Sequence, residues 1–513
     1  MASAVADRVR PRVDALAAAR WATPALLLAL TALSIALRTR VVDAGLWIDE
    51  GLSIGVAHHS LADIPRVLRQ DGSPPLYYLL LHVWIGVFGD SEQATHALSV
   101  LFAVACIPAA YWAASRFFGR VAGWICAALA AVDPYLSAYG QETRMYTLLA
   151  LLSFGASVGF LRAVVDGDRR WLPVLVVSLA GMLYTHNWAL FFCAGLVVAT
   201  LLVARDHLRE ALLAAAGTVL LYAPWLPTLL SQVRHTGAPW SREPSLHELL
   251  LAPGGVFAGD APLVAFALAA GVGLPLVARV GSRGRRIVNA LAAIVVTTIL
   301  VAWTASQLSP AWATRYFAVV LAPSLVLASA GVVRAGRLGA IALGLVLVLW
   351  TNNNPRADKS DVRELAELVA PYARAGDVVL STHPEQAPVI RYYLGDGFRW
   401  ATTLGPMDDP RVHDWRDAVD RLEAAPPRPT LDRVITEVTP GRRLIVVRPI
   451  FRDYRGWQAE WTELVYERSR QWERLLRRDP RLRHLVHVQP DEFALEKRFS
   501  KAVEADVYVR RGS

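Results

Sequence analysis

The sequence predicts an α-helical, polytopic membrane protein that carries a C-terminal α/β domain. Hydrophobic residues make up 54% of the 513 residues, and charged residues only 19%. Apolar runs recur from about residue 21 to residue 351, and from Thr351 onward charges are dense and no run is long enough to cross a bilayer. This change in texture predicts a boundary between a membrane domain (21–351) and a second domain (352–513).

Each apolar run of roughly 20 residues can cross the hydrocarbon core of a bilayer as a helix. The run at 74–89, PPLYYLLLHVWIGVFG, is shorter, so we predict an interfacial or re-entrant helix there, within a large first outer loop at 39–95. On this basis we expect about eleven spans, at residues 21–38, 96–117, 121–138, 145–165, 171–185, 188–204, 210–229, 261–280, 287–306, 316–333 and 338–351.

Arginine residues predict the orientation of these spans. The N-terminal tail (1–20) and every second loop are rich in Arg, and the loops between them carry fewer cations. Because short cytoplasmic loops are enriched in Lys and Arg, we expect a cytoplasmic basic tail and an extracytoplasmic C-terminal domain in a multi-pass plasma (inner) membrane protein. The net charge of +9 then reflects topology, and no nucleic-acid partner is predicted.

Several classes of site are missing from the sequence. It contains no P-loop, no dinucleotide-binding glycine motif and no Cys/His spacing for zinc, so no metal ligands are predicted. Cys106, Cys126 and Cys193 lie in apolar segments, where packing is the usual role of cysteine. The later spans have almost no charged residues in their middles, although ion-coupled carriers commonly need such groups there. This pattern argues against a transporter.

The motif WIDEG places two adjacent acids, Asp49 and Glu50, in the first outer loop. One interpretation is a helix cap, because acidic residues favour the first turn of a helix. The other is a catalytic carboxylate that accepts a proton from an attacking hydroxyl, with its neighbour holding geometry or a cation. The pair alone favours neither interpretation.

Further polar groups lie at the outer ends of predicted spans. Pro74 and Pro75 precede an aromatic segment, and these aromatic side chains suit either a membrane-interface belt or a platform beside a lipid head group. An Arg at the outer surface suits a phosphate contact, although each such residue alone is more often an interfacial anchor. The segments are RQDGSPPLYY with Asp71, Tyr77 and Tyr78, QETRMY with Glu142, Arg144 and Tyr146, YTHNW with His186, and ATRYF with Arg315 and Tyr316.

These motifs resemble those of the GT-C superfamily of membrane glycosyltransferases. The order W-x-D-E, then D-G-x-P-P-L-Y-Y-x-L-L-x-x-W-x-x-x-F-G, then E-x-R-x-Y is similar to bacterial relatives of protein O-mannosyltransferases and of the aminoarabinose transferase that modifies lipid A. The resemblance covers roughly residues 20–350 and is most specific in 45–90 and 139–146. It implies a GT-C-like membrane domain.

The resemblance also implies a reaction. The donor would be a polyprenyl-phosphate sugar such as mannose, and the acceptor a hydroxyl of a lipid, glycan or protein outside the membrane. Asp49 would be the catalytic base, Glu50 and Glu142 would assist it, and we expect inversion at the anomeric carbon. No cofactor is required, although a divalent cation between these three acids is left open.

The remaining candidate residues divide between a donor-phosphate site and a substrate pocket. Arg144 and Arg315 are expected to bind the phosphate together with His96, which stands where family members often have Arg. The expected pocket consists of Asp71, Tyr77, Tyr78, Tyr146, His186 and Tyr316. The alternatives are a lipid or polysaccharide transporter or flippase, and a non-catalytic scaffold of the cell envelope.

The C-terminal domain reads as alternating helices and strands. RRLIVVRPI has the pattern of a buried strand and DVYVRR that of a closing strand, and the Arg/Glu-rich sequence between them is predicted to be helical. Similar tails occur in some GT-C relatives, where they resemble lids or acceptor-recognition modules. A solubilising domain without direct chemistry is an equal alternative. STHPEQAP, with one His and one Glu, is a weak indication of a metal or catalytic loop.

Overall fold

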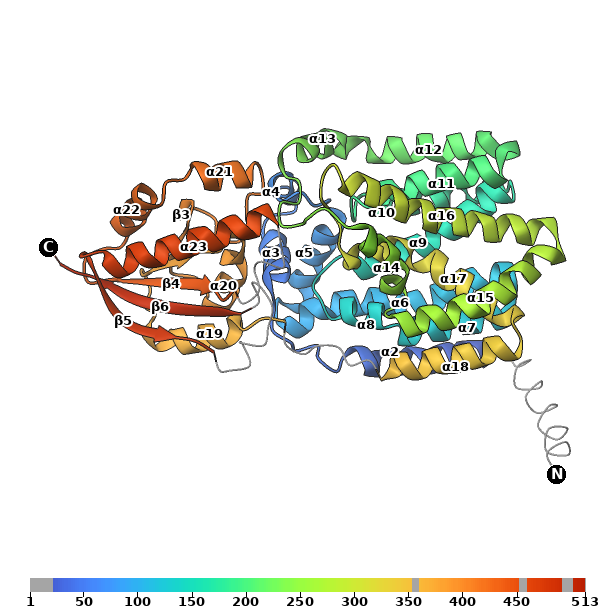
Figure 1. Cartoon of the computed structure of the whole chain (residues 1–513), viewed down its shortest axis with the longest axis horizontal. Helices are drawn as coiled ribbons and strands as arrows, with labels where there is room; N and C mark the ends of the chain where they lie inside the picture. The colour runs from blue at the N-terminus through green and yellow to red at the C-terminus, as the bar shows by residue number, and fades with distance from the viewer. Residues whose placement is uncertain (1–21, 353–358, 452–458, 491–501, 513) are drawn as a thin grey trace, which may run out of the picture.

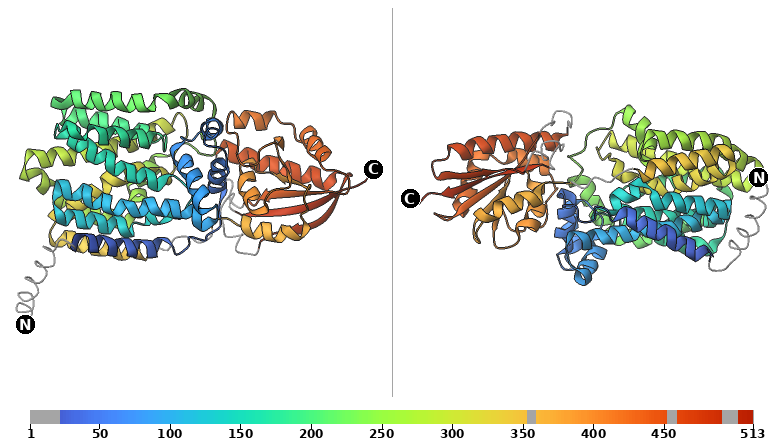
Figure 2. Two further views of the ribbon diagram at one scale, coloured as in Figure 1. Left: turned by 180° about the vertical axis from the view of Figure 1, so that it is seen from behind. Right: turned by 90° about the horizontal axis from the view of Figure 1, so that it is seen from below.

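The computed structural model describes residues 22–352, 359–451, 459–490 and 502–512. A long helical bundle and an α/β domain lie end to end, and three short helices lie where they meet (Figure 1 and Figure 2): α3 (Ile48–Ala57), α4 (Ile64–Asp71) and α5 (Leu76–Phe88). A mostly helical chain with a small C-terminal sheet domain confirms the predicted fold class. The predicted tail at 1–20 lies outside the described residues.

The bundle consists of helices whose bounds follow the apolar runs of the sequence. They are α2 (Ala22–Arg38), α6 (Glu92–Phe118), α7 (Arg120–Val132), α8 (Pro134–Gly140), α9 (Tyr146–Phe160), α10 (Leu172–Leu183), α11 (Ala189–Val203), α12 (Leu208–Tyr222), α13 (Leu226–His235), α14 (Leu246–Val256), α15 (Asp260–Val280), α16 (Ser282–Ser306), α17 (Ala318–Arg334) and α18 (Arg337–Thr351). Short turns of helix extend several of them, among them η5 (Thr314–Phe317) before α17.

The apolar helices of the bundle fall into two classes by length. Within the described ranges, six helices are long and apolar enough to cross a membrane, or seven if the bent pair α7 and α8 forms one span. Four shorter apolar helices accompany them, including α5, whose 13 residues extend about 20 Å, less than the roughly 30 Å hydrocarbon core. The count of eleven spans therefore stays a prediction.

One predicted span, 121–138, is bent in the structure. The axes of α7 and α8 differ by 44°. The break lies at Asp133 and Pro134, because proline has no N–H and its ring clashes with the preceding turn of a continuing helix. The Asp133 carboxylate accepts the Leu136 N–H at 3.0 Å and so caps the new helix. The bend brings the following turn, 141–145, toward the end of the bundle.

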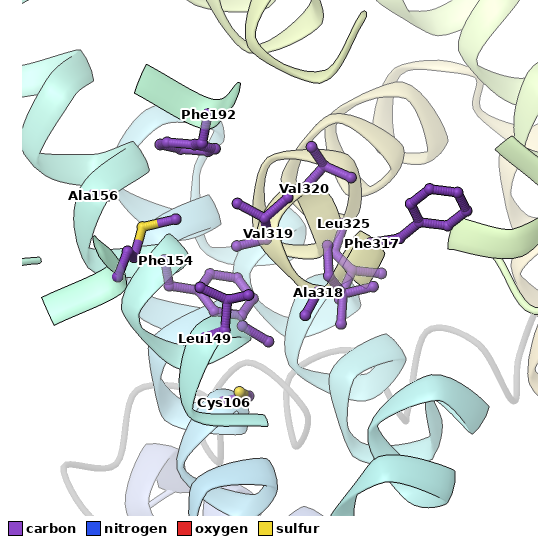
Figure 3. Packing of buried hydrophobic residues seen from close by; sticks show 14 of the residues in the cluster. Cys106, Leu149, Phe154, Ala156, Phe192, Phe317, Ala318, Val319, Val320 and Leu325 are labelled. Atoms are coloured by element: carbon purple, nitrogen blue, oxygen red, sulfur yellow. The ribbon is translucent and has the colours of Figure 1, made fainter. Parts of the chain in front are cut away.

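A continuous apolar core holds the bundle together. Figure 3 shows part of it, in which Leu149 and Phe154 of α9 lie between Phe192 of α11 and Cys106 of α6. Val319 of α17 belongs to the same cluster. All five are buried. Their burial agrees with a packing role for this cysteine.

The α/β domain contains a six-stranded sheet. Its strands are β1 (Val378–Ser381), β2 (Arg399–Thr402), β3 (Gly405–Met407), β4 (Arg443–Pro449), β5 (Leu482–Val488) and β6 (Val503–Arg510). The order is β3-β2-β1-β4-β6-β5, with β1 parallel to β2 and β4, and the other pairs antiparallel. Sequence patterns indicated β4 and β6 as strands and missed β5, an edge strand with mostly exposed or half-buried side chains.

Helices cover both faces of this sheet (Figure 1). One face packs against α19 (Val362–Val369) and α20 (Ala387–Leu394), and the other against α22 (Pro427–Glu437) and α23 (Glu460–Arg478). A short helix, α21 (Ala418–Ala424), packs beside α23. Leu46 and Ile54, from the first loop of the membrane domain, belong to the same hydrophobic cluster as α19 and α20. The two parts of the chain thus share a core.

Candidate active site

Asp49 lies in the first turn of α3, at the junction of the helical bundle and the α/β domain. Its side chain is half-buried, with 20% of its surface exposed. Two guanidinium groups approach the same carboxylate oxygen, Oδ2: Nε of Arg144 at 4.0 Å and Nη2 of Arg315 at 3.9 Å. These separations are ionic but too long for direct hydrogen bonds. The site therefore combines one accessible carboxylate with two cations.

Arg144 reaches Asp49 from the turn between α8 and α9. Its Nη1 donates to the Asp49 carbonyl at 3.2 Å, to Ser53 Oγ at 3.0 Å and to the Tyr78 hydroxyl at 3.4 Å. Its Nε is buried and makes no hydrogen bond with the protein. The guanidinium is thus fixed in position with one N–H still able to bind an anion.

Arg315 comes from η5, at the start of α17. Its guanidinium lies 4.9 Å from the ring centroid of Trp240, 5.4 Å from that of Tyr316 and 5.8 Å from that of Trp47. Aromatic faces hold a cation in place without neutralising it. Nε of Arg315 is also buried and makes no hydrogen bond with the protein. Both cations therefore retain donor capacity next to Asp49.

Three aromatic side chains line the wall beside the two arginines. The ring centroids of Tyr316 and His186 are 4.5 Å apart, and Tyr146 lies 6.2 Å from Tyr316 and 6.1 Å from His186. Burial and the charges of Arg144 and Arg315 lower the pKa of His186 to about 3, so this imidazole is neutral. The Tyr146 hydroxyl is buried and has no hydrogen-bond partner in the protein, which leaves it available to a ligand.

The PPLYY segment is buried and does not form an exposed aromatic belt. Tyr77 and Tyr78 are both fully buried in α5. Tyr78 contacts Arg144 directly, but the Tyr77 hydroxyl lies 3.0 Å from Ser99 Oγ, and Ser99 in turn donates to the Arg144 carbonyl at 3.1 Å. Tyr77 thus supports the site from behind, a difference from the predicted position in the pocket.

Asp71 and Glu142 lie on turns at the edge of the site. Asp71 ends α4, where burial raises the pKa of its carboxyl group although Ser73 and Arg144 oppose this effect. The next residue, Gly72, accepts a hydrogen bond from Asn187 at 3.1 Å, which ties this turn to the one that carries His186. Glu142 is half-buried, and its carbonyl accepts the Arg144 N–H at 2.7 Å.

Glu50 and His96 do not face this site. The Glu50 side chain is fully buried, and Nζ of Lys359 donates to both of its oxygens at 2.8 Å. His96 Nε2 lies 2.7 Å from Oε1 of Glu50, and the Thr143 N–H donates to the same oxygen at 2.7 Å. Oε2 also accepts the Trp47 N–H at 3.3 Å, as in a helix cap.

These contacts change the interpretation of two predicted residues. Because the carboxylate of Glu50 is fully paired, the structure favours a structural role for it over the predicted catalytic one. His96 is equally buried beside Glu50, which places it away from a donor phosphate at the two arginines. Among the residues that the structure describes, no three His, Cys, Asp or Glu side chains gather to hold a metal ion.

Sequence reasoning missed Lys359, Trp240 and Ser53. Lys359 is the sole lysine in the first 496 residues of an Arg-rich chain and follows the last apolar run closely. That isolation was a signal available in the sequence. Trp240 and Ser53 have no comparable signal, because each acts through a contact with a residue far away along the chain.

An open groove of about 670 Å³ lies beside this site. It is lined by residues 233–239 and 241–243, by residues 308–310, and by the start of α21 with Glu460. Trp240, between two lining residues, is the side chain that covers Arg315. The groove therefore lies between the bundle and the α/β domain, and Asp49 is not among its lining residues.

Comparison with known proteins shows a likeness in fold and a match of part of the chain to one family. Residues 72–229 match the family of dolichyl-phosphate-mannose-protein mannosyltransferases. No curated protein sequence matches the chain. The structure of ArnT from Cupriavidus metallidurans in the apo state is similar, with a TM-score of 0.62 and 13% identity over 94% of this chain and 98% of that one.

Two further structures share this likeness. ArnT from Cupriavidus metallidurans bound to undecaprenyl phosphate has a TM-score of 0.58 and 12% identity, over 95% of this chain and 98% of that one. The oligosaccharyltransferase AglB from Archaeoglobus fulgidus, in complex with an inhibitory peptide and a dolichol-phosphate, has a TM-score of 0.50 and 10% identity, over 84% and 70%. The matched stretch 72–229 includes Tyr77, Tyr78 and Arg144, and the chain as a whole has a fold like that of ArnT.

Proposed function

We propose that the protein transfers a sugar from a polyprenyl phosphate to an acceptor hydroxyl outside the cytoplasm, with Asp49 as the general base. The observation that carries this proposal is the placement of Arg144 and Arg315 within 4.0 Å of one accessible carboxylate oxygen. Undecaprenyl phosphate and dolichol-phosphate, bound by ArnT and AglB, are both polyprenyl phosphates, which supports this donor class.

The donor phosphate binds at the two arginines. Each retains a buried Nε–H without a protein partner, and charge-assisted hydrogen bonds to phosphate oxygens would satisfy both. Tyr146, whose hydroxyl also lacks a partner, lies beside them and contacts either the phosphate or the sugar. Neutral His186 and Tyr316 form the wall against which the sugar ring packs.

The reaction is a direct displacement at the anomeric carbon. The acceptor hydroxyl gives its proton to the Asp49 carboxylate as its oxygen forms a bond to this carbon. The bond from the carbon to the phosphate oxygen breaks, and the polyprenyl phosphate leaves with an additional negative charge. Arg144 and Arg315 stabilise this developing charge. One displacement inverts the configuration of the sugar.

We assign the acceptor to the groove beside Trp240. Its lining carries both guanidinium and carboxylate groups, among them Arg234, Arg242, Asp420 and Glu460. Such a surface suits a polar acceptor with several hydroxyl groups, because carboxylates accept and guanidinium groups donate hydrogen bonds. The alternation of Arg between loops supports an orientation in which this groove and the α/β domain face away from the cytoplasm of the plasma (inner) membrane.

The test uses the full chain in lipid nanodiscs with a panel of radiolabelled undecaprenyl-phosphate sugars and an envelope extract of the native host as the acceptor source. We expect the wild type to release undecaprenyl phosphate and to label an acceptor. Asp49→Asn should lower the turnover about 10²–10⁴-fold, the usual contribution of a general base. The matched control is Asp43→Asn, an exposed acid in the same loop.

Three outcomes would contradict the proposal. Full transfer by Asp49→Asn would remove Asp49 as the base. If no donor in the panel is consumed while labelled lipid crosses the bilayer of proteoliposomes, the protein is a flippase. Retention of configuration in the product would exclude the single displacement.

A further inference from the structure

The helix that carries Asp49 is enclosed by the α/β domain as well as by the bundle. All residues of α3 except Asp49 are buried. Ile54 of α3 and Leu46 before it lie in one hydrophobic cluster with Val379 of β1 and Ile445 of β4. Part of the core of the α/β domain is therefore supplied by the segment around Asp49.

Two glycines of α3 allow this close approach. A Cβ atom at Gly51 would lie 2.5–2.7 Å from atoms of Val389 in α20, and one at Gly55 would lie 1.9 Å from the Arg411 carbonyl oxygen. Real Cβ atoms essentially never come so near. Because residues four apart lie on one face of a helix, Gly51 and Gly55 form a single face in contact with the α/β domain.

The backbone that precedes α3 is also held by the α/β domain, through hydrogen bonds. The Leu46 N–H donates to the Tyr393 hydroxyl at 2.7 Å, and the Leu46 carbonyl accepts from Ser360 Oγ at 2.5 Å. Arg363 donates to the Asp43 carbonyl at 2.6 Å. Residues that follow the membrane domain in sequence thus bind the chain immediately before α3.

Lys359 makes the contact nearest to Asp49. Its Nζ donates to both oxygens of Glu50 at 2.8 Å and to the Gln141 carbonyl at 2.7 Å, and lies 3.0 Å from His96 Nε2. The cluster is closed, because Glu50 and His96 are fully buried and Lys359 is 7% exposed. His96 Nδ1 lies 2.6 Å from the Val42 carbonyl, which can only accept, so Nδ1 carries a proton.

This ammonium group links the two elements of the proposed site, in addition to the hydrogen bonds from Thr143 to Glu50 and from Arg144 to the Asp49 carbonyl and Ser53. Glu50 is adjacent to Asp49 on α3, and Gln141 begins the turn that carries Arg144. Removing Lys359 would leave a buried carboxylate without its strongest partner, and nothing else in the described residues donates to both Glu50 and the Gln141 carbonyl. Lys359 is therefore one of the groups that set the geometry between Asp49 and Arg144, and the one that the α/β domain contributes.

We propose that Lys359 is a positioning residue, through which the α/β domain sets the geometry between Asp49 and Arg144. The inference rests on the proposed role of Asp49 in transfer. It assigns to the α/β domain a part in setting the geometry of the site, in place of a purely solubilising one. Lys359 itself does not contact the donor.

The decisive variant is the double substitution Glu50→Gln with Lys359→Met. It removes both charges together, so no buried charge is left unpaired, and the fold is expected to retain most of its stability. Because the tie to the Gln141 carbonyl is gone, we expect kcat to fall at least 10-fold with little change in KM for the donor. Amide hydrogen exchange in residues 48–57 should become at least 10-fold faster.

The matched control is Arg448→Met in β4. Arg448 is also buried and pairs with Glu473, Glu504 and Asp506, but it lies in the sheet and away from α3. This variant should lose thermal stability while its folded fraction keeps the wild-type kcat and the wild-type exchange in residues 48–57. It separates loss of position from general loss of stability.

The results that would overturn the proposal are distinct from those that would overturn the function. If the double variant recovers both wild-type stability and wild-type kcat, or if α3 exchanges at the wild-type rate, Lys359 has no positioning role. If the wild type consumes no polyprenyl-phosphate donor, the proposed function fails. In that case the hydrogen-exchange arm still reports on the contact between Lys359 and α3.

Discussion

Asp49 and Glu50 are neighbours in the sequence and occupy opposite environments. Asp49 is 20% exposed and faces two arginines that each keep an N–H without a protein partner. Glu50 is fully buried, and its two oxygens receive hydrogen bonds from Lys359, Thr143 and Trp47. The unpaired N–H groups around Asp49 can bind a ligand, whereas the fully paired, buried groups around Glu50 stabilise the fold.

We expect the largest effect on the free energy of unfolding from Glu50→Gln. The variant leaves Lys359 buried without its counter-charge, and breaking a buried ion pair in this way costs about 3–5 kcal/mol. Chemical unfolding in detergent measures this loss. Asp49→Asn, in the same experiment, should leave the unfolding free energy within about 0.5 kcal/mol of the wild type. Equal losses in the two variants would contradict the division of roles.

Arg315→Met tests the accessible site around Asp49. Loss of a hydrogen bond to a charged group costs about 1.5–3 kcal/mol, so we expect the affinity for undecaprenyl phosphate to fall about 10–100-fold. Binding of undecaprenyl phosphate to the protein in nanodiscs gives the dissociation constant. Arg66→Met is the control, because Arg66 is 79% exposed on α4. Unchanged affinity in Arg315→Met would remove Arg315 from the phosphate site.

The pH dependence of stability tests the buried cluster around Glu50. Although burial alone raises the pKa of Glu50, the charges and hydrogen bonds of Lys359 and His96 lower it to about 2, from an ordinary 4.5. Ionised Glu50 therefore stabilises the fold above pH 4.5, and this contribution is lost as the pH falls from 4.5 to about 2. Unfolding curves should show this loss in the wild type and a weaker pH dependence in the Glu50→Gln, Lys359→Met double variant. Identical pH dependence in both proteins would contradict it.

The smallest effects are expected at two adjacent tyrosines of α5. Tyr77→Phe removes a buried hydrogen bond to Ser99 and should cost about 0.5–1.5 kcal/mol of stability, with turnover unchanged. Tyr78→Phe should cost a similar amount and also slow transfer, because Tyr78 accepts a hydrogen bond from Arg144. Unfolding and turnover measured together would distinguish a supporting residue from one at the site. Slower transfer by Tyr77→Phe alone would reverse the assignment.

Much of the site could be predicted because its residues lie in short polar motifs at the ends of apolar runs. Asp49, Arg144 and Arg315 come from three such motifs, and the structure brings each arginine within 4.0 Å of Asp49. The role of Glu50 could not be predicted in the same way. An acid in the first turn of a helix reads alike whether it faces a substrate or a buried lysine more than 300 residues away.

Local sequence patterns were enough to predict the membrane class, a boundary near residue 351 where hydropathy falls, and the order of the outer polar motifs. These follow from local composition and periodicity, which need no knowledge of distant contacts. Only the tertiary structure decided which of two adjacent acids is open and that the α/β domain encloses α3. Those outcomes depend on pairs such as Glu50 with Lys359 and Gly55 with Arg411, which close-packing brings together from opposite ends of the chain.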